Sequence, residues 1–222
     1  MHSDSVTLSS SIRIDRVANS RVQEVDFAFV PFSSVFSDHM FSAGFQDGRW
    51  SDGLIQPYGP ISVAPSISAL HYGISVFEGL KAHKSAEGRP LLFRPRENAQ
   101  RLQRSAARLA IPVISESLFL EVLRELIRLD QAWIPPADVG ALYIRPILFS
   151  VDPSIRVKPA DRCQFIILTF PFGAYFADPV DVVVCKAMYE HFREVQATQS
   201  PQATTPPGSS QTRRCGKLGS LQ

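Results

Sequence analysis

Cysteine is scarce in this 222-residue sequence, and its placement excludes two common uses of the residue. The three cysteines, Cys163, Cys185 and Cys215, are odd in number and far apart, and no CxxC pair is present. A disulfide framework needs paired cysteines and a structural zinc site needs closely spaced ligands, so the sequence predicts neither. A reducing compartment is therefore the expected environment.

The sequence also lacks an excess of charge and long apolar runs. Its 23 basic and 21 acidic residues leave a net charge of +2, which gives no extended basic field for nucleic acid or an anionic membrane. No apolar run approaches the ~20 residues that cross a bilayer, and the first residues lack the apolar core of a secretory signal. The hydrophobic content of 45% nevertheless suffices for a core. We therefore expect a soluble globular protein that binds neither nucleic acid nor membrane.

Both ends of the chain have compositions that argue against a packed fold. Residues 1–22 are rich in serine and arginine, but Asp4 and Asp15 interrupt the acid-poor pattern of a mitochondrial presequence. We expect a disordered tail there and a cytoplasmic protein, with a mitochondrial protein as the alternative. Residues 196–216 contain no Leu, Ile, Val, Met or aromatic residue and cannot bury enough apolar surface to offset the entropy of ordering. Residues 187–222 are therefore predicted to be a disordered or interrupted junction.

Residues 23–186 carry the signals of strands, a hairpin and two helices. Alternation predicts a short strand over 25–29, and Asp47-Gly48 between apolar runs predicts a hairpin. A helix is expected from Glu97, with Leu102, Ala106 and Leu109 on its apolar face. A second helix follows Ser115, a suitable N-cap, and ends near residue 133.

The remaining apolar runs complete the prediction of fold class. The run 91–93 is brief, and three longer runs follow at 141–150, 165–170 and 180–185. Their β-branched and aromatic content favours strands. Strands and helices folded on one core predict an α+β domain over residues 23–186.

One stretch, His71–Lys81, concentrates aromatic, polar and glycine residues as nothing else in the chain does. Leu70, Ile74 and Phe77 fall at helical spacing, while Gly73 and Gly79 allow a turn or a close approach of a ligand to the backbone. We interpret this stretch as part of a site, in which Tyr72 and Phe77 can wall a pocket.

Four sequence blocks carry a resemblance to a known family. In chain order they are HYGISVFEGLKAH, LLFRPRENAQRLQRSAARL, ALYIRPILF and FPFGAYF. Their order and spacing resemble the branched-chain amino-acid aminotransferases, which are fold-type IV enzymes dependent on pyridoxal 5′-phosphate. The resemblance covers about residues 36–176. It implies the small N-terminal domain of such an enzyme, with the second domain largely missing.

The resemblance assigns the cofactor phosphate to Arg101 and the substrate pocket to several residues. A guanidinium suits a phosphate because it can donate two charge-assisted hydrogen bonds, although a solvated arginine on a polar helix face is the alternative. Arg145 lies in an apolar run, so it should meet an anion or reach solvent. The resemblance places it against the carboxylate of glutamate or 2-oxoglutarate, and a structural ion pair is the alternative. The aromatic residues matching the family's pocket, which could equally be core, are Tyr72, Phe77, Tyr143 and Tyr175.

The lysine that carries the cofactor as a Schiff base has one candidate, Lys217, in the segment Cys215-Gly216-Lys217-Leu218-Gly219. The family's Gly-Gly-Asn-Tyr context is incomplete here, so a solvated lysine in a frayed terminus is the alternative. Neither Lys81 nor Lys84 lies in that context. His71 is expected to be hydrogen-bonded rather than catalytic.

The implied activity is amino transfer between leucine, isoleucine, valine or a related amino acid and 2-oxoglutarate through pyridoxal 5′-phosphate, in a family of homodimers. Because the second domain supplies part of the site, we expect this chain to be inactive alone. One alternative is a non-catalytic dimerisation module. Others are a related enzyme acting on D-amino acids or aminodeoxychorismate, and a transaminase that supplies amino acids within a biosynthetic cluster.

Overall fold

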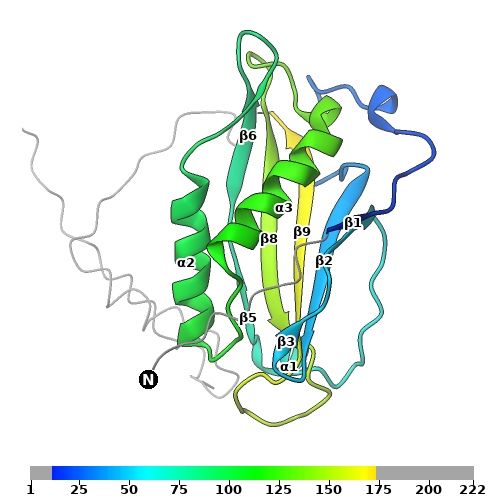
Figure 1. The fold of residues 1–222 in the computed structure, drawn as a ribbon. Helices are drawn as coiled ribbons and strands as arrows, with labels where there is room; N and C mark the ends of the chain where they lie inside the picture. Colours follow the sequence, from blue (N-terminus) through cyan, green and yellow to red (C-terminus); the bar gives the residue numbers. More distant parts are fainter. Residues whose placement is uncertain (1–11, 174–222) are drawn as a thin grey trace, which may run out of the picture. The chain divides into compact units, whose positions relative to one another are not determined.

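The computed structural model describes residues 12–173, which form one antiparallel-rich sheet backed by two helices (Figure 1). The strands are β1 (Arg13–Ile14), β2 (His39–Gln46), β3 (Arg49–Trp50), β4 (Leu54–Pro57), β5 (Ser75–Phe77), β6 (Leu80–Lys84), β7 (Pro90–Leu92), β8 (Ala141–Ser150) and β9 (Cys163–Phe172). The helices are α1 (Ser68–Tyr72), α2 (Pro95–Arg108) and α3 (Glu116–Leu129), with 3₁₀ turns at Val22–Glu24 and Gln131–Trp133. The predicted α+β class is confirmed.

The sheet runs in the order β1-β4-β2-β9-β8-β6-β7, with β3 paired to β2 and β5 paired to β8. All pairs are antiparallel except β1 with β4. β8 and β9 pair over their whole length, from Ala141 opposite Phe172 to Ser150 opposite Cys163. The strands predicted at 141–150 and 165–170 are thus confirmed, and the strand predicted at 180–185 lies outside the described residues.

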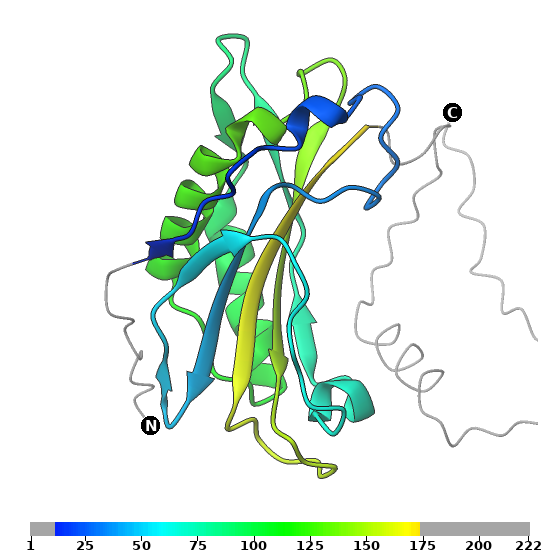
Figure 2. The same cartoon turned by 90° about the vertical axis from the view of Figure 1, so that its right-hand side faces the viewer.

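Helices α2 and α3 pack on the same face of the sheet (Figures 1 and 2). Their apolar stripes are buried against the sheet in a single core. Large, fully buried side chains of this core include Leu102 of α2, Phe119, Leu123 and Leu126 of α3, Phe41, Leu142, Ile144 and Phe165 of the sheet, and Trp133 of the 3₁₀ turn after α3. We call the opposite face of the sheet the outer face. Within residues 12–173, no helix combines the length and apolar character that crossing a membrane requires.

Local sequence signals account for where these two helices begin. α2 starts at Pro95, two residues before the predicted Glu97, because the fixed φ of proline suits the first turn of a helix. The Ser115 hydroxyl accepts a hydrogen bond from the Leu118 N–H at 3.3 Å and caps α3, as predicted. α3 ends at Leu129, and a 3₁₀ turn continues the chain to Trp133.

The predicted hairpin at Asp47-Gly48 is also confirmed. Both residues have positive φ, 54° and 75°, as the tight turn between β2 and β3 requires. The helical spacing of Leu70 and Phe77, by contrast, does not extend through the site stretch. Gly73 has φ 64° and ends α1, and Phe77 lies in β5, where pairing with β8 replaces the helix.

The prediction of disorder is wrong for residues 12–22. The N–H groups of Arg13 and Asp15 donate to the carbonyl oxygens of Gly53 and Ile55, both at 2.8 Å. The N–H of Val17 donates to the buried His39 ring at 3.1 Å. These partners are distant in sequence, so composition alone could not reveal them. Residues 1–11 lie outside the described part.

The predicted strand over 25–29 is likewise wrong. Its alternation is overridden by Asp26, whose carboxylate accepts a hydrogen bond from the Ala28 N–H at 3.0 Å and whose carbonyl accepts one from the Phe29 N–H at 3.2 Å. Aspartate favours turns through such local bonds. The Phe29 side chain is consequently exposed.

Candidate functional site

Strand β8 divides its side chains between the two faces of the sheet. Leu142, Ile144 and Leu148 are buried beneath the helices, whereas Tyr143 and Arg145 alternate with them and lie on the outer face. Pairing with β5, β6 and β9 brings three more side chains to that face, namely Phe77, Lys81 and Phe170. The sequence order of β8 thus separates a core surface from a polar and aromatic one.

Three consecutive residues at the junction of β5 and β6, Phe77, Glu78 and Gly79, contact Arg145, Arg101 and Tyr143 respectively. The Phe77 ring lies under the Arg145 guanidinium, with 4.3 Å from its carbon to the ring centroid. Glu78 pairs with Arg101. At Gly79, a Cβ atom would lie only 2.2 Å from the Tyr143 hydroxyl. A side chain at this glycine would therefore displace the tyrosine.

Among the residues that the structure describes, Arg145 interacts with aromatic groups rather than with a carboxylate. Its Nη2 donates to the Tyr143 hydroxyl at 3.0 Å, and its guanidinium carbon lies 5.2 Å from the centroid of the same ring. No carboxylate within residues 12–173 forms an ion pair with it. The described residues therefore give no support to the structural ion pair considered above. They leave a half-buried cation, held by rings, that can receive an anion.

Arg101 has a carboxylate partner that the sequence analysis missed. Its Nε and Nη2 donate to the two carboxylate oxygens of Glu78 at 2.5 and 2.6 Å, and Asn98 Nδ2 donates to the same carboxylate at 3.0 Å. Burial alone would raise the pKa of Glu78, but the bonds from Arg101 and Asn98 outweigh it and hold the pKa below its ordinary value. Glu78 in turn raises the pKa of Arg101. Both groups are therefore charged at neutral pH.

A signal for Glu78 was present in the sequence. It is an acidic residue that directly follows the apolar residues Val76 and Phe77. In the structure its side chain is only 3% exposed. A buried carboxylate needs a cation or several hydrogen bonds, so this position could have indicated that Glu78 has a partner, although not which one. The identity of that partner depended on how α2 lies against the sheet.

Aromatic rings surround Tyr143 on the outer face. Its ring stacks on Phe170 with centroids 4.9 Å apart, and Phe32 packs edge-on against it at 5.3 Å. The Lys81 ammonium lies 5.1 Å from the centroid of Phe172, which also contacts Tyr143. Lys81, Phe32, Phe170 and Phe172 were not among the predicted site residues. The alternation of β9 could have indicated the two phenylalanines on that strand.

The structure does not join Tyr72 to this cluster. Its hydroxyl donates to the Ile155 carbonyl oxygen at 3.2 Å, in the loop between β8 and β9. His71 contacts the Pro65 carbonyl oxygen at 3.0 Å, as expected for a hydrogen-bonded rather than a catalytic histidine. The other two predicted site residues, Tyr175 and Lys217, lie outside the described residues.

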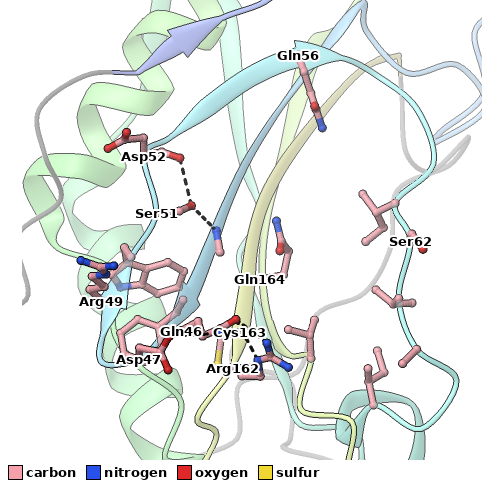
Figure 3. Close-up of a pocket in the computed structure, with 18 of the residues that line it drawn as sticks. Gln46, Asp47, Arg49, Ser51, Asp52, Gln56, Ser62, Arg162, Cys163 and Gln164 are labelled. Atoms are coloured by element: carbon pink, nitrogen blue, oxygen red, sulfur yellow. Dashed lines mark hydrogen bonds between the residues drawn. The ribbon is translucent and has the colours of Figure 1, made fainter.

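The structure also has a cleft of about 1100 Å³ that is separate from the cluster around Tyr143 and Arg101 (Figure 3). It runs between the β2–β3 hairpin, the start of β9 and the connection that follows β4. Arg162 spans part of it, donating to the Gln46 side-chain oxygen at 2.6 and 3.1 Å. Of the predicted site residues that lie within 12–173, none lines this cleft. Its volume therefore gives no support to the predicted site.

The fold and site together define an α+β protein with two arginines, one paired with a buried carboxylate and one held by aromatic rings. No family model matches the chain. The branched-chain-amino-acid aminotransferase of Mycolicibacterium smegmatis is 40% identical over 178 residues, which cover 79% of this chain and 48% of that protein. Branched-chain-amino-acid transaminase 1 of Bacillus subtilis is 40% identical over 157 residues, covering 70% of this chain and 44% of that protein.

Among solved structures, a branched-chain amino acid aminotransferase of Escherichia coli aligns with a TM-score of 0.49 and 33% identity, over 62% of this chain and 41% of that one. The sequence matches make the chain a homologue of the branched-chain-amino-acid aminotransferases and confirm the resemblance found in its sequence. The chain spans about half the length of the relatives it matches.

Proposed function

We propose that this chain serves branched-chain amino transfer, and that its described residues form the part that holds the phosphate of pyridoxal 5′-phosphate and walls the substrate pocket. The observation that carries the proposal is the convergence at Phe77, Glu78 and Gly79 of contacts to Arg145, Arg101 and Tyr143, in a sequence 40% identical to two such enzymes. The reaction would move an amino group between leucine, isoleucine or valine and 2-oxoglutarate. Localisation in the cytoplasm or in mitochondria stays a prediction.

The residues near Arg101 fit a phosphate group. The Arg101 side chain is 61% exposed, and Glu78 occupies only two of its five N–H groups. The remaining N–H groups can donate charge-assisted hydrogen bonds to phosphate oxygens. When bound, pyridoxal 5′-phosphate supplies the electron sink that makes loss of the amino acid's Cα proton feasible.

The outer face suits the substrate itself. Arg145 can bind the carboxylate of 2-oxoglutarate or glutamate, because no carboxylate of the described chain competes for it. Phe77 and Tyr143 provide apolar surface for a branched side chain. Tyr175 and the cofactor-carrying lysine, proposed as Lys217, would complete the site.

The binding of 2-oxoglutarate to the full 222-residue chain, measured by calorimetry with pyridoxal 5′-phosphate present, tests this proposal. Arg145→Gln should weaken binding by about tenfold or more, since a hydrogen bond to a charged group contributes about 1.5–3 kcal/mol. Arg104→Gln is the matched control, because it makes the same substitution at an arginine on α2 to which the proposed function assigns no role. Equal affinities for wild type and Arg145→Gln would refute the assigned role.

A second candidate function is a dimerisation module, which the exposure of apolar side chains within and next to the stretch His71–Lys81 favours. Leu70 is 67% exposed and Phe77 is 59% exposed. Such surfaces are often covered by a partner, here a second copy of the chain. Light scattering on the same samples distinguishes the two functions. A stable dimer that binds no 2-oxoglutarate supports the module, whereas a strict monomer contradicts it.

A further inference from the structure

The guanidinium of Arg101 has two hydrogen-bonding edges, and Glu78 uses only one of them. Its carboxylate accepts bonds from Nε and Nη2, so the edge formed by these two nitrogens is occupied. The second edge carries one N–H group of Nη1 and the other N–H group of Nη2, while the remaining N–H of Nη1 points back toward Cδ. No other acceptor within residues 12–173 forms a hydrogen bond with Arg101. That edge is therefore available to a ligand.

Glu78 is itself held firmly from several directions. Its backbone N–H donates to the Pro146 carbonyl oxygen at 2.9 Å, directly after the pairing of β5 with β8. Its carboxylate also accepts a hydrogen bond from Asn98, which lies three residues before Arg101 on the same face of α2. A fixed carboxylate restricts the rotamers of the long arginine side chain that binds it. The direction of the second edge is thereby fixed as well.

The geometry points to Glu78 as a positioning residue that orients Arg101 so that its second edge binds a phosphate monoester. This inference rests on the proposed function, in which Arg101 anchors the cofactor phosphate. The sequence analysis expected two charge-assisted hydrogen bonds from Arg101 to the phosphate and identified no carboxylate partner for this arginine. Here the fork is divided, with one edge on the protein and the other on the ligand.

Two opposite effects of Glu78 must be compared. Its negative charge repels a phosphate, whereas its grip on Arg101 removes the entropy cost of ordering that side chain on binding. This repulsion between Glu78 and the phosphate is reduced for two reasons. The positive guanidinium of Arg101 would lie between the two anions, and the Arg101 side chain is largely exposed to water, which screens charge. We therefore expect positioning to outweigh repulsion.

Variants of the full chain can separate positioning from charge. Glu78→Gln removes the charge and keeps the shape, while Glu78→Asp keeps the charge and shifts the carboxylate by one methylene. Arg101→Gln removes the anion-binding group. Arg101→Lys keeps a cation beside Glu78 in case the buried carboxylate variants fold poorly, but it has no second edge. Glu97→Gln is the matched control, because Glu97 lies on α2 in an exposed pair with Arg94.

Two measurements are made on each variant, after circular dichroism has verified folding. One is the affinity for inorganic phosphate and for pyridoxal 5′-phosphate, by calorimetry. The other is the ¹⁵N NMR signal of the Arg101 Nε–H, which the bond to Glu78 should protect from exchange with water. Glu78→Gln and Glu78→Asp should each weaken phosphate affinity by about threefold to tenfold, the scale on which ordering one long side chain changes a Kd. Arg101→Lys should weaken it similarly, and Glu97→Gln should leave it unchanged.

The outcomes distinguish failure of this inference from failure of the proposed function. If Arg101→Gln lowers phosphate affinity but Glu78→Gln and Glu78→Asp bind as wild type does, the positioning role is refuted and the anchor remains. Tighter binding by Glu78→Gln also refutes positioning, because it shows that repulsion dominates. If wild type binds no phosphate, or Arg101→Gln binds it equally well, both the anchor and its positioning are refuted. Weaker binding by both Glu78 variants, with loss of the protected Nε–H signal in Glu78→Gln, supports the inference.

Discussion

Two glycine-to-alanine substitutions, identical in chemistry, should have opposite effects on stability. Neither Gly79 nor Gly59 has a positive φ, so alanine is compatible with both backbones. At Gly59 an added Cβ atom meets nothing within 4 Å. At Gly79 it would lie 2.2 Å from the Tyr143 hydroxyl oxygen and 3.0 Å from the ring carbon that bears it. Only the surroundings differ between the two sites.

The magnitude follows from how firmly Tyr143 is held. Relief of the clash requires the ring to move by roughly 1 Å, against its stack on Phe170 and its hydrogen bond from Arg145. Overpacking of this kind costs about 1–3 kcal/mol, partly offset by a gain of about 0.4–1 kcal/mol from a less flexible unfolded chain. We expect Gly79→Ala to lower the free energy of unfolding by about 1–2 kcal/mol. Gly59→Ala has no clash and only makes the unfolded chain less flexible, so it should raise the free energy of unfolding slightly.

Urea denaturation followed by circular dichroism measures both free energies, and a double-mutant cycle identifies the cause. Tyr143→Phe removes the oxygen at 2.2 Å but keeps the ring carbon at 3.0 Å, so it should rescue Gly79→Ala in part. The coupling between the two sites should exceed about 0.5 kcal/mol. Equal stability of the two alanine variants, or no coupling with Tyr143→Phe, would refute the close approach of Gly79 to Tyr143.

Two further predictions concern buried groups outside the site. Burial alone would raise the pKa of Asp38, but hydrogen bonds from Ser20, Trp133 and Arg21 outweigh it and hold the pKa below its ordinary value of 3.8. The resulting stabilisation is present above pH 3.8 and is lost as the pH falls through the lower pKa of the folded state. In urea denaturation, Asp38→Asn should therefore lower the free energy of unfolding by about 2 kcal/mol at pH 7 and by less below pH 3.8. A loss of stability that does not depend on pH would contradict this. Burial, and to a smaller extent nearby carboxylates, raises the pKa of the Cys163 thiol to about 12. The thiol is therefore protonated and unreactive at pH 8, and iodoacetamide should modify it only after the chain has unfolded. Mass spectrometry of the peptide that contains Cys163 detects the modification. Rapid labelling of this cysteine in the native chain would show that it is accessible.

Much of the fold was predictable because its signals are local. The Asp47-Gly48 turn, the Ser115 cap and the apolar stripes of α2 and α3 each depend on a few neighbouring residues, and the structure has all of them. The strand prediction at 25–29 failed for a local reason as well, because a turn-forming Asp26 outweighs alternation.

The candidate site was predicted only as separate residues. The sequence marked Arg101, Arg145, Phe77 and Tyr143, but it did not show that Arg101 shares its guanidinium with Glu78. It also placed Tyr72 in the same pocket, whereas the Tyr72 hydroxyl bonds to the β8–β9 loop. Partners that are distant in sequence become neighbours only through strand register and helix packing, which a single sequence does not encode in any local pattern.

By itself, the sequence determined the α+β class, the two amphipathic helices, the hairpin and the kinship with branched-chain-amino-acid aminotransferases. Only the tertiary structure decided that residues 12–22 are ordered, that Glu78 holds Arg101, and that the Tyr143 hydroxyl lies over Gly79. The physical reason is the range of the interactions. Turns, caps and periodicity act over a few residues, whereas buried polar groups take whichever partner the packed sheet and helices bring within hydrogen-bond distance.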